Sequence, residues 1–102
     1  MRQQIIEAVY KAIDYTNRQR EGEPPIRKSM ETALFGSSSD LDSLGLVNLV
    51  VSVEEKIEEA FSTSITLADD RALSQEMSPF STVESLVNYI EALLKEKKAS
   101  GP

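Results

Sequence analysis

The chain has 102 residues, which is enough for one small domain with a single core, and it contains neither cysteine nor histidine. These absences exclude disulfide bonds, thiolate chemistry, a Ser-His-Asp triad and a His/Cys zinc site, and we therefore do not expect an enzyme. The net charge is -6, and residues 43–94 carry nine acidic but two basic side chains. Such a surface repels nucleic acid and anionic lipid and attracts basic protein partners.

The sequence has no feature typical of a membrane-inserted or secreted protein. No apolar run is long enough to span a bilayer, and the first residues lack the apolar stretch of a signal peptide. Together with the lack of cysteine, this leads us to expect a cytoplasmic protein that does not insert into membranes.

An amphipathic helix is predicted over residues 3–20. Apolar side chains recur there at helical spacing, namely Ile5, Ile6, Val9, Ala12 and Ile13. Gly22 suits the end of a helix, and the adjacent Pro24 and Pro25 prevent its continuation. This boundary is the clearest one in the sequence.

A long connection follows over residues 22–42, which is unusual in a compact domain and typical of functional loops. Within it, a helical turn is predicted around residues 29–35. We expect Leu34, Phe35 and Leu41 to point into the core.

A second helix is predicted from Asp42, as its N-cap, to about Phe61. Its apolar positions form one continuous stripe at helical spacing, namely Leu46, Leu49, Val50, Val53, Ile57 and Phe61. Four acidic residues cover the outer face of its second half, namely Glu54, Glu55, Glu58 and Glu59. A strand at residues 49–53 would fit the valines, but the period of 3.6 residues favours a helix.

A loop anchored to the core and two more helices are predicted from the sequence of the last third of the chain. Ile65 and Leu67 are expected to anchor the loop, and a short helix is predicted at 69–76. Ser81 and Glu84 have the spacing of a capping box for a last helix at 82–96. The buried stripe of that helix comprises Val83, Leu86, Val87, Ile90 and Leu93 or Leu94.

The predicted fold is therefore all-α, a small four-helix bundle with three longer helices, one short helix and a long first loop. Residues 1–94 form the single domain in this interpretation. Residues 95–102 are expected to be a frayed C-terminal tail.

A serine between an acid and a leucine, Asp42-Ser43-Leu44, stands where the strongest predicted helix begins. The hydroxyl of Ser43 can accept a tethered group. The sequence resembles the acyl carrier protein family over residues 3–94. The resemblance lies in the order of the predicted helices and in three stretches, residues 41–47, 61–65 and 81–83. The resemblance implies the same four-helix fold.

This resemblance implies that Ser43 is esterified by 4'-phosphopantetheine, which a separate phosphopantetheinyl transferase moves from coenzyme A. The thiol at the end of the arm then carries an acyl group as a thioester. In the family, the acid at Asp42 is also read by the transferase, and Leu44 forms a lip against which partners press. From the residues alone, Asp42 is equally a helix cap and Leu44 a core residue.

The family also implies that acyl-loading, modifying and acyl-accepting enzymes dock on the second helix through basic patches. Glu54 and Glu55 are the acidic candidates for that contact, and Val47 and Val51 the apolar ones. The simpler interpretations are that the glutamates form a solvated face and that the valines belong to a wide buried stripe. We expect a monomer. We also expect no metal site, because Asp69-Asp70 lacks the spacing of a calcium loop.

Two positions depart from the family pattern. Gly45 and Asn48 stand where carriers of fatty acid synthesis commonly have acids, and both changes weaken the negative face nearest Ser43. The connections at 22–42 and 74–81 are also longer than usual. These features favour a stand-alone carrier for a specialised lipid, polyketide or related pathway, or a carrier of amino-acyl groups.

One alternative is a helical protein-interaction module that has the same fold but bears no arm. An autonomous hydrolase is a more distant alternative, because few catalytic groups are present.

Overall fold

The computed structural model describes residues 2–20, 22, 25–34, 43–67 and 80–100, with the backbone alone at residues 43 and 97–100. These residues contain three helices, α1 (Arg2–Gln19), α2 (Ser43–Phe61) and α4 (Val83–Ser100), and no strand. The prediction of an all-α fold is confirmed for this part of the chain. The short helix predicted at 69–76 lies outside the described residues, as do Phe35, Leu41 and Asp42.

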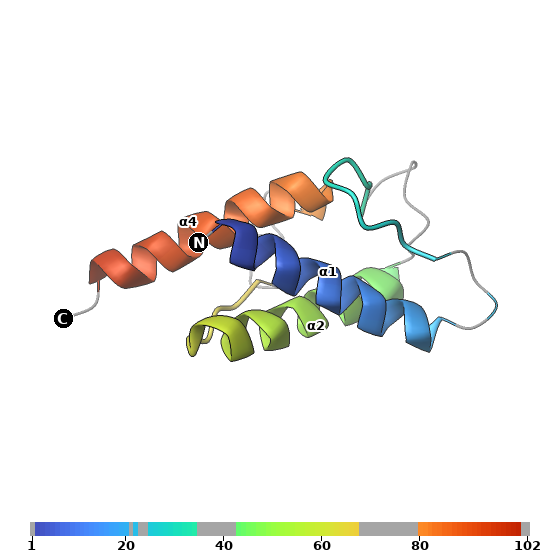
Figure 1. Ribbon diagram of the computed structural model, residues 1–102, viewed down its shortest axis with the longest axis horizontal. Coiled ribbons are helices and arrows are strands. Elements are labelled where there is room, and N and C mark those ends of the chain that lie inside the picture. Colours follow the sequence, from blue (N-terminus) through green and yellow to red (C-terminus); the bar gives the residue numbers. More distant parts are fainter. Residues whose placement is uncertain (1, 21, 23–24, 35–42, 68–79, 101–102) are drawn as a thin grey trace.

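The helices form a small bundle in which α1 runs opposite to α2 and α4 (Figure 1). Because α1 ends where α2 begins, the long first connection joins neighbouring ends of these two helices. The bounds of α1 and α2 agree with the predicted ones to within one residue.

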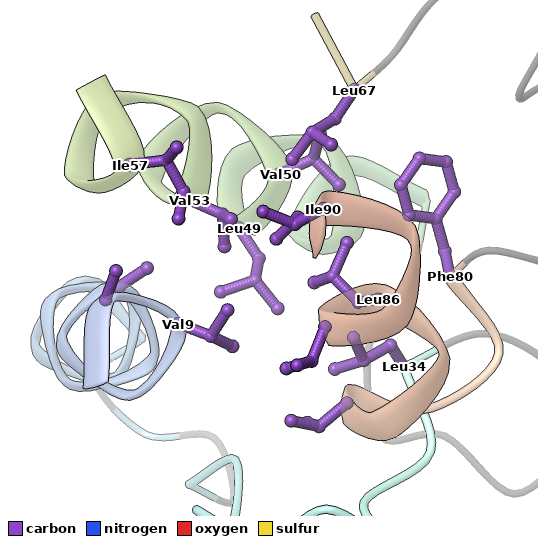
Figure 2. Close-up of a cluster of buried hydrophobic side chains, with 14 of the residues drawn as sticks. Val9, Leu34, Leu49, Val50, Val53, Ile57, Leu67, Phe80, Leu86 and Ile90 are labelled. Carbon is purple, nitrogen blue, oxygen red and sulfur yellow. The ribbon is translucent and has the colours of Figure 1, made fainter. Parts of the chain in front are cut away.

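The core lies between the three helices and is closed by side chains from the connections (Figure 2). The apolar stripes predicted for the helices are buried, except that Ile6, Phe61 and Leu93 are half-buried at the edge of the core. The connections supply further buried residues, namely Ile26, Leu34, Ile65, Leu67 and Phe80. Ile65 and Leu67 thus anchor the loop after α2 as predicted.

The turn after α1 is held by a side-chain clamp. The Asn17 amide nitrogen donates to the carbonyl of Ile26 at 3.0 Å, and its oxygen accepts from the Ile26 N–H at 2.7 Å. Gly22 has a φ of 82°, a left-handed conformation that glycine adopts without strain. Because α1 already ends at Gln19, Gly22 belongs to the turn that follows the helix and is not its immediate cap.

The capping box of the last helix is shifted by one residue from the predicted pair, Ser81 and Glu84. Thr82 Oγ1 accepts from the Ser85 N–H at 3.1 Å, and Ser85 Oγ accepts from the Thr82 N–H at 2.9 Å. The carbonyl of Ser81 instead accepts from the Leu34 N–H at 2.9 Å, next to an isolated bridge between Ala33 and Thr82. This extended pairing holds Ser81 outside the helix, so that Thr82 becomes the N-cap.

The last helix continues to Ser100, past the end we expected near residue 96. Residues 95–100, which we expected to fray, are helical. Lysine, glutamate and alanine favour helix, and this segment contains no glycine or proline. Among the described helices, none is long and apolar enough to cross a membrane.

Candidate functional site

Ser43 is the first residue of α2. Backbone N–H groups in the first turn of a helix have no partner within the helix, and they lie at the positive end of its dipole. The first turn of α2 itself carries no acidic side chain, and the acid Asp42 immediately precedes it in the sequence. The start of α2 is therefore a suitable position for a group that carries negative charge.

Three large apolar side chains lie exposed on α2 close to Ser43. Leu44, Val47 and Val51 have 69%, 51% and 44% of their surface exposed, whereas Val53 on the opposite side is fully buried. The interpretation of Val47 and Val51 as part of the buried stripe is therefore wrong, and Leu44 is a surface residue. Because residues seven apart are nearly aligned on a helix, Leu44 and Val51 lie on one face.

The two candidate docking glutamates lie in different environments. Glu55 is exposed and stands eleven residues after Leu44, roughly three helical turns, so it continues the same exposed line. Glu54 is half-buried, and its Oε2 accepts a hydrogen bond from the backbone N–H of Leu67 at 2.6 Å. Glu54 therefore holds the loop after α2, and the structure separates it from the exposed face to which we assigned it.

The C-terminal half of α2 has an acidic exposed surface, to which Glu55, Glu58 and Glu59 contribute. Lys56 is half-buried and lies toward α1, where its Nζ is 5.8 Å from the centre of the Tyr15 ring and 3.6 Å from Glu59 Oε2. The lysine offsets part of the charge of Glu59. The exposed surface of α2 thus changes from apolar near Ser43 to acidic toward Phe61.

The C-terminal half of α1 and the N-terminal half of α2 adjoin (Figure 1). A groove of about 310 Å³ lies between them. The residues that line it include Thr16, Arg20, Gly45, Asn48, Val51 and Ser52. Gly45 is in the first turn of α2, so one end of the groove is near the start of that helix, whereas Ser43, two residues earlier, lies about 200° around the helix axis. Exposed Tyr15 and Glu55 also border the groove.

Thr16 and Ser52 are the two buried polar side chains in the described part of the chain, with 4% and 6% exposure, and both line this groove. The Thr16 Oγ1 atom has no hydrogen-bond partner among the described residues. Leaving a buried hydroxyl unpaired costs about 1–3 kcal/mol. We did not predict either residue from the sequence, although Thr16 follows Ala12 by four residues and so interrupts the apolar stripe of α1.

The described residues contain no group of three or more side chains that could hold a metal ion. No protein-family model, curated protein or solved structure matches the chain. A functional proposal therefore depends on the residues around the start of α2.

Proposed function

We propose that the chain is a carrier protein of the acyl carrier type, and that Ser43 bears a 4'-phosphopantetheine arm. The observation that carries this proposal is the position of Ser43, which opens a helix whose exposed line continues through Leu44, Val51 and Glu55. An attachment point followed by an apolar and then acidic surface suits a protein that presents a tethered group to other proteins.

The attachment step breaks a phosphoanhydride bond and forms a phosphate ester. The Ser43 oxygen forms a bond to the phosphorus that carries pantetheine, and the pyrophosphate bridge of coenzyme A breaks. Adenosine 3',5'-bisphosphate leaves, and the serine proton passes to a base that the phosphopantetheinyl transferase supplies. This chain contributes the nucleophile and needs no catalytic group of its own.

The arm supplies a chemical group that the chain lacks. There is no cysteine in the sequence, and a serine ester is a poor acyl donor, whereas the arm ends in a thiol that forms a reactive thioester. The phosphodiester lies at the N-terminus of α2, where the helix dipole contributes about 0.3–1 kcal/mol.

The exposed face of α2 is the proposed docking surface. Leu44, Val47 and Val51 provide its apolar part, and Glu55 pairs with basic patches of the loading, modifying and accepting enzymes. Glu54 is not part of this surface, because its carboxylate is engaged in the hydrogen bond to the backbone of Leu67. The carrier acts as a cytoplasmic monomer in this proposal.

The finer fold assignment belongs to the same proposal. A short helix at 69–76 completes a four-helix bundle of the acyl carrier type. The neutral residues Gly45 and Asn48 near the attachment point favour a specialised lipid, polyketide, amino-acyl or related pathway over housekeeping fatty acid synthesis.

The exposed apolar residues beside Ser43 also favour a second candidate, a protein-interaction module that bears no arm. Modification by a broad-specificity phosphopantetheinyl transferase, measured as a mass gain, tests the carrier proposal. In cells, Ser43→Ala should abolish the function of a carrier but leave that of an unmodified module intact. Val47→Asp places a charge on the docking surface and should impair the function of a carrier and of an unmodified module alike. It therefore shows what loss of docking looks like in the same assay.

A further inference from the structure

The described residues expose four large hydrophobic side chains, and one of them lies on α1 rather than on α2. This residue is Tyr15, which is 43% exposed and borders the α1–α2 groove together with Val51 and Glu55 of α2. Val51 and Glu55 belong to the exposed line of α2 that begins at Leu44. Tyr15 therefore extends the exposed surface of α2 across the groove and onto α1.

The two ends of this groove carry opposite charges. Because α1 runs opposite to α2 (Figure 1), Arg20 lies at the Gly45 end and Tyr15 at the Glu55 end. Arg20 follows Tyr15 by five residues, which is roughly 7.5 Å at the rise of a helix. The exposed carboxylate of Glu58, about one turn beyond Glu55, adds to the negative charge of the second end. A positively charged group is thus attracted to the end formed by Tyr15 and Glu55.

The ring of Tyr15 already contacts one cation, which comes from outside the groove. Lys56 Nζ lies 5.8 Å from the centre of the ring, within range of a cation–π interaction. Lys56 lines a separate hollow that it shares with Lys11 and Glu59, and it is not among the residues that line the groove. Its Nζ also lies 3.6 Å from Glu59 Oε2, so its charge is partly offset there. Lys56 therefore does not fill the groove.

Three chemical features meet at this end of the groove: an exposed aromatic ring, an exposed carboxylate and an exposed apolar side chain, from Tyr15, Glu55 and Val51. A long basic side chain matches all three, because its stem is apolar and its head is charged. Arginine fits better than lysine, since a planar guanidinium stacks on an aromatic ring and can donate two N–H groups to one carboxylate.

We propose that Tyr15 of α1 is part of the docking surface, and that the groove between Tyr15 and Glu55 receives an arginine side chain of a partner protein. The inference extends the docking surface of the proposed function, and it rests on that surface and not on the arm. Ser43 and Gly45 lie on opposite sides of Leu44 around the axis of α2. A partner held by the groove can therefore leave the attachment point uncovered.

The test is an NMR titration of the labelled protein with a capped, alanine-rich helical peptide. The peptide carries two leucines and one arginine at successive turns of one face, which matches the spacing of Val47, Val51 and Glu55 along α2. Saturable shifts are expected at the backbone amides of Tyr15, Val51 and Glu55. A second peptide with glutamine in place of the arginine should bind more weakly.

Two pairs of proteins identify the groups that bind the arginine. Tyr15→Leu keeps an apolar side chain but removes the ring, and should weaken binding of the arginine peptide roughly two- to fivefold, the equivalent of an exposed cation–π contact. The same variant should bind the glutamine peptide as the parent does. Glu55→Gln should weaken binding of the arginine peptide more than Glu58→Gln, because Glu58 does not line the groove.

The outcomes separate this inference from the carrier function. Failure of the peptide to bind, equal affinity for the two peptides, or an equal loss for both peptides in Tyr15→Leu would overturn the arginine site. A mass gain at Ser43 in that case would leave the carrier function standing. Arginine-dependent binding without any mass gain would overturn the carrier function, and would support the arginine site on an interaction module that bears no arm.

Discussion

The carboxylate of Glu54 accepts a hydrogen bond of 2.6 Å from the backbone N–H of Leu67, thirteen residues further along the chain. Its neighbour Glu55 is exposed to solvent on the line of residues that begins at Leu44. Two adjacent glutamates of one helix therefore have different roles. Glu54 stabilises the loop that covers the core, and Glu55 remains exposed to solvent.

Glu54→Ala is expected to lower the free energy of unfolding by about 1.5–3 kcal/mol, because hydrogen bonds to charged groups contribute in this range. Glu55→Ala removes the same side chain from the next position and should change stability by less than about 0.5 kcal/mol. Urea unfolding of both variants measures the difference. Equal stabilities would contradict the assignment of a structural role to Glu54.

Val53→Asp should unfold the domain, whereas Val51→Asp should fold like the parent. Val53 is fully buried, so its replacement places an unpaired charge in the core, at a cost of more than about 3 kcal/mol. Val51 is 44% exposed, and a charge there remains hydrated. Far-UV circular dichroism during heating compares the variants, and similar melting of the two would show that the buried stripe is misplaced.

Thr82→Ala is expected to destabilise the protein by about 1 kcal/mol, because it removes the N-cap of α4. Ser81→Ala should have a much smaller effect, since the bond of Ser81 to Leu34 uses a backbone carbonyl that the substitution leaves in place. Thermal unfolding of the two variants measures this. A larger loss of stability from Ser81→Ala than from Thr82→Ala would show that Ser81 is the N-cap, as predicted from the sequence.

Thr16→Val should raise the stability of the unmodified protein by about 1 kcal/mol. The substitution keeps the branched shape and removes a buried hydroxyl that has no hydrogen-bond partner among the described residues. Urea unfolding of the parent and the variant tests this, and a variant less stable than the parent would contradict it.

The helices and their buried faces could be predicted from the sequence because periodicity determines which side of a helix is apolar. The stripe from Leu46 to Ile57 is an example, since its spacing leaves one consistent orientation. The exposed valines could not be assigned in this way. Val47 and Val51 are as hydrophobic as Val53, and their exposure depends on where the other helices pack.

Local polar contacts were harder to predict because they depend on neighbours distant in sequence. The bridge between Ala33 and Thr82 moves the capping box by one residue, and the loop at Leu67 distinguishes Glu54 from Glu55. The start of a helix at Ser43 could be predicted because its signals are local, whereas the groove could not, since Thr16 and Ser52 come from different helices.

The central claim is that Ser43 accepts a phosphopantetheine group, and intact mass spectrometry tests it most directly. The protein is incubated with coenzyme A and a broad-specificity phosphopantetheinyl transferase, alongside Ser43→Ala and Ser64→Ala, which replaces an exposed serine elsewhere. A gain of one phosphopantetheine in the parent and in Ser64→Ala, absent from Ser43→Ala, is the predicted result. No gain in folded parent protein, with a transferase shown to modify another carrier, would contradict the account.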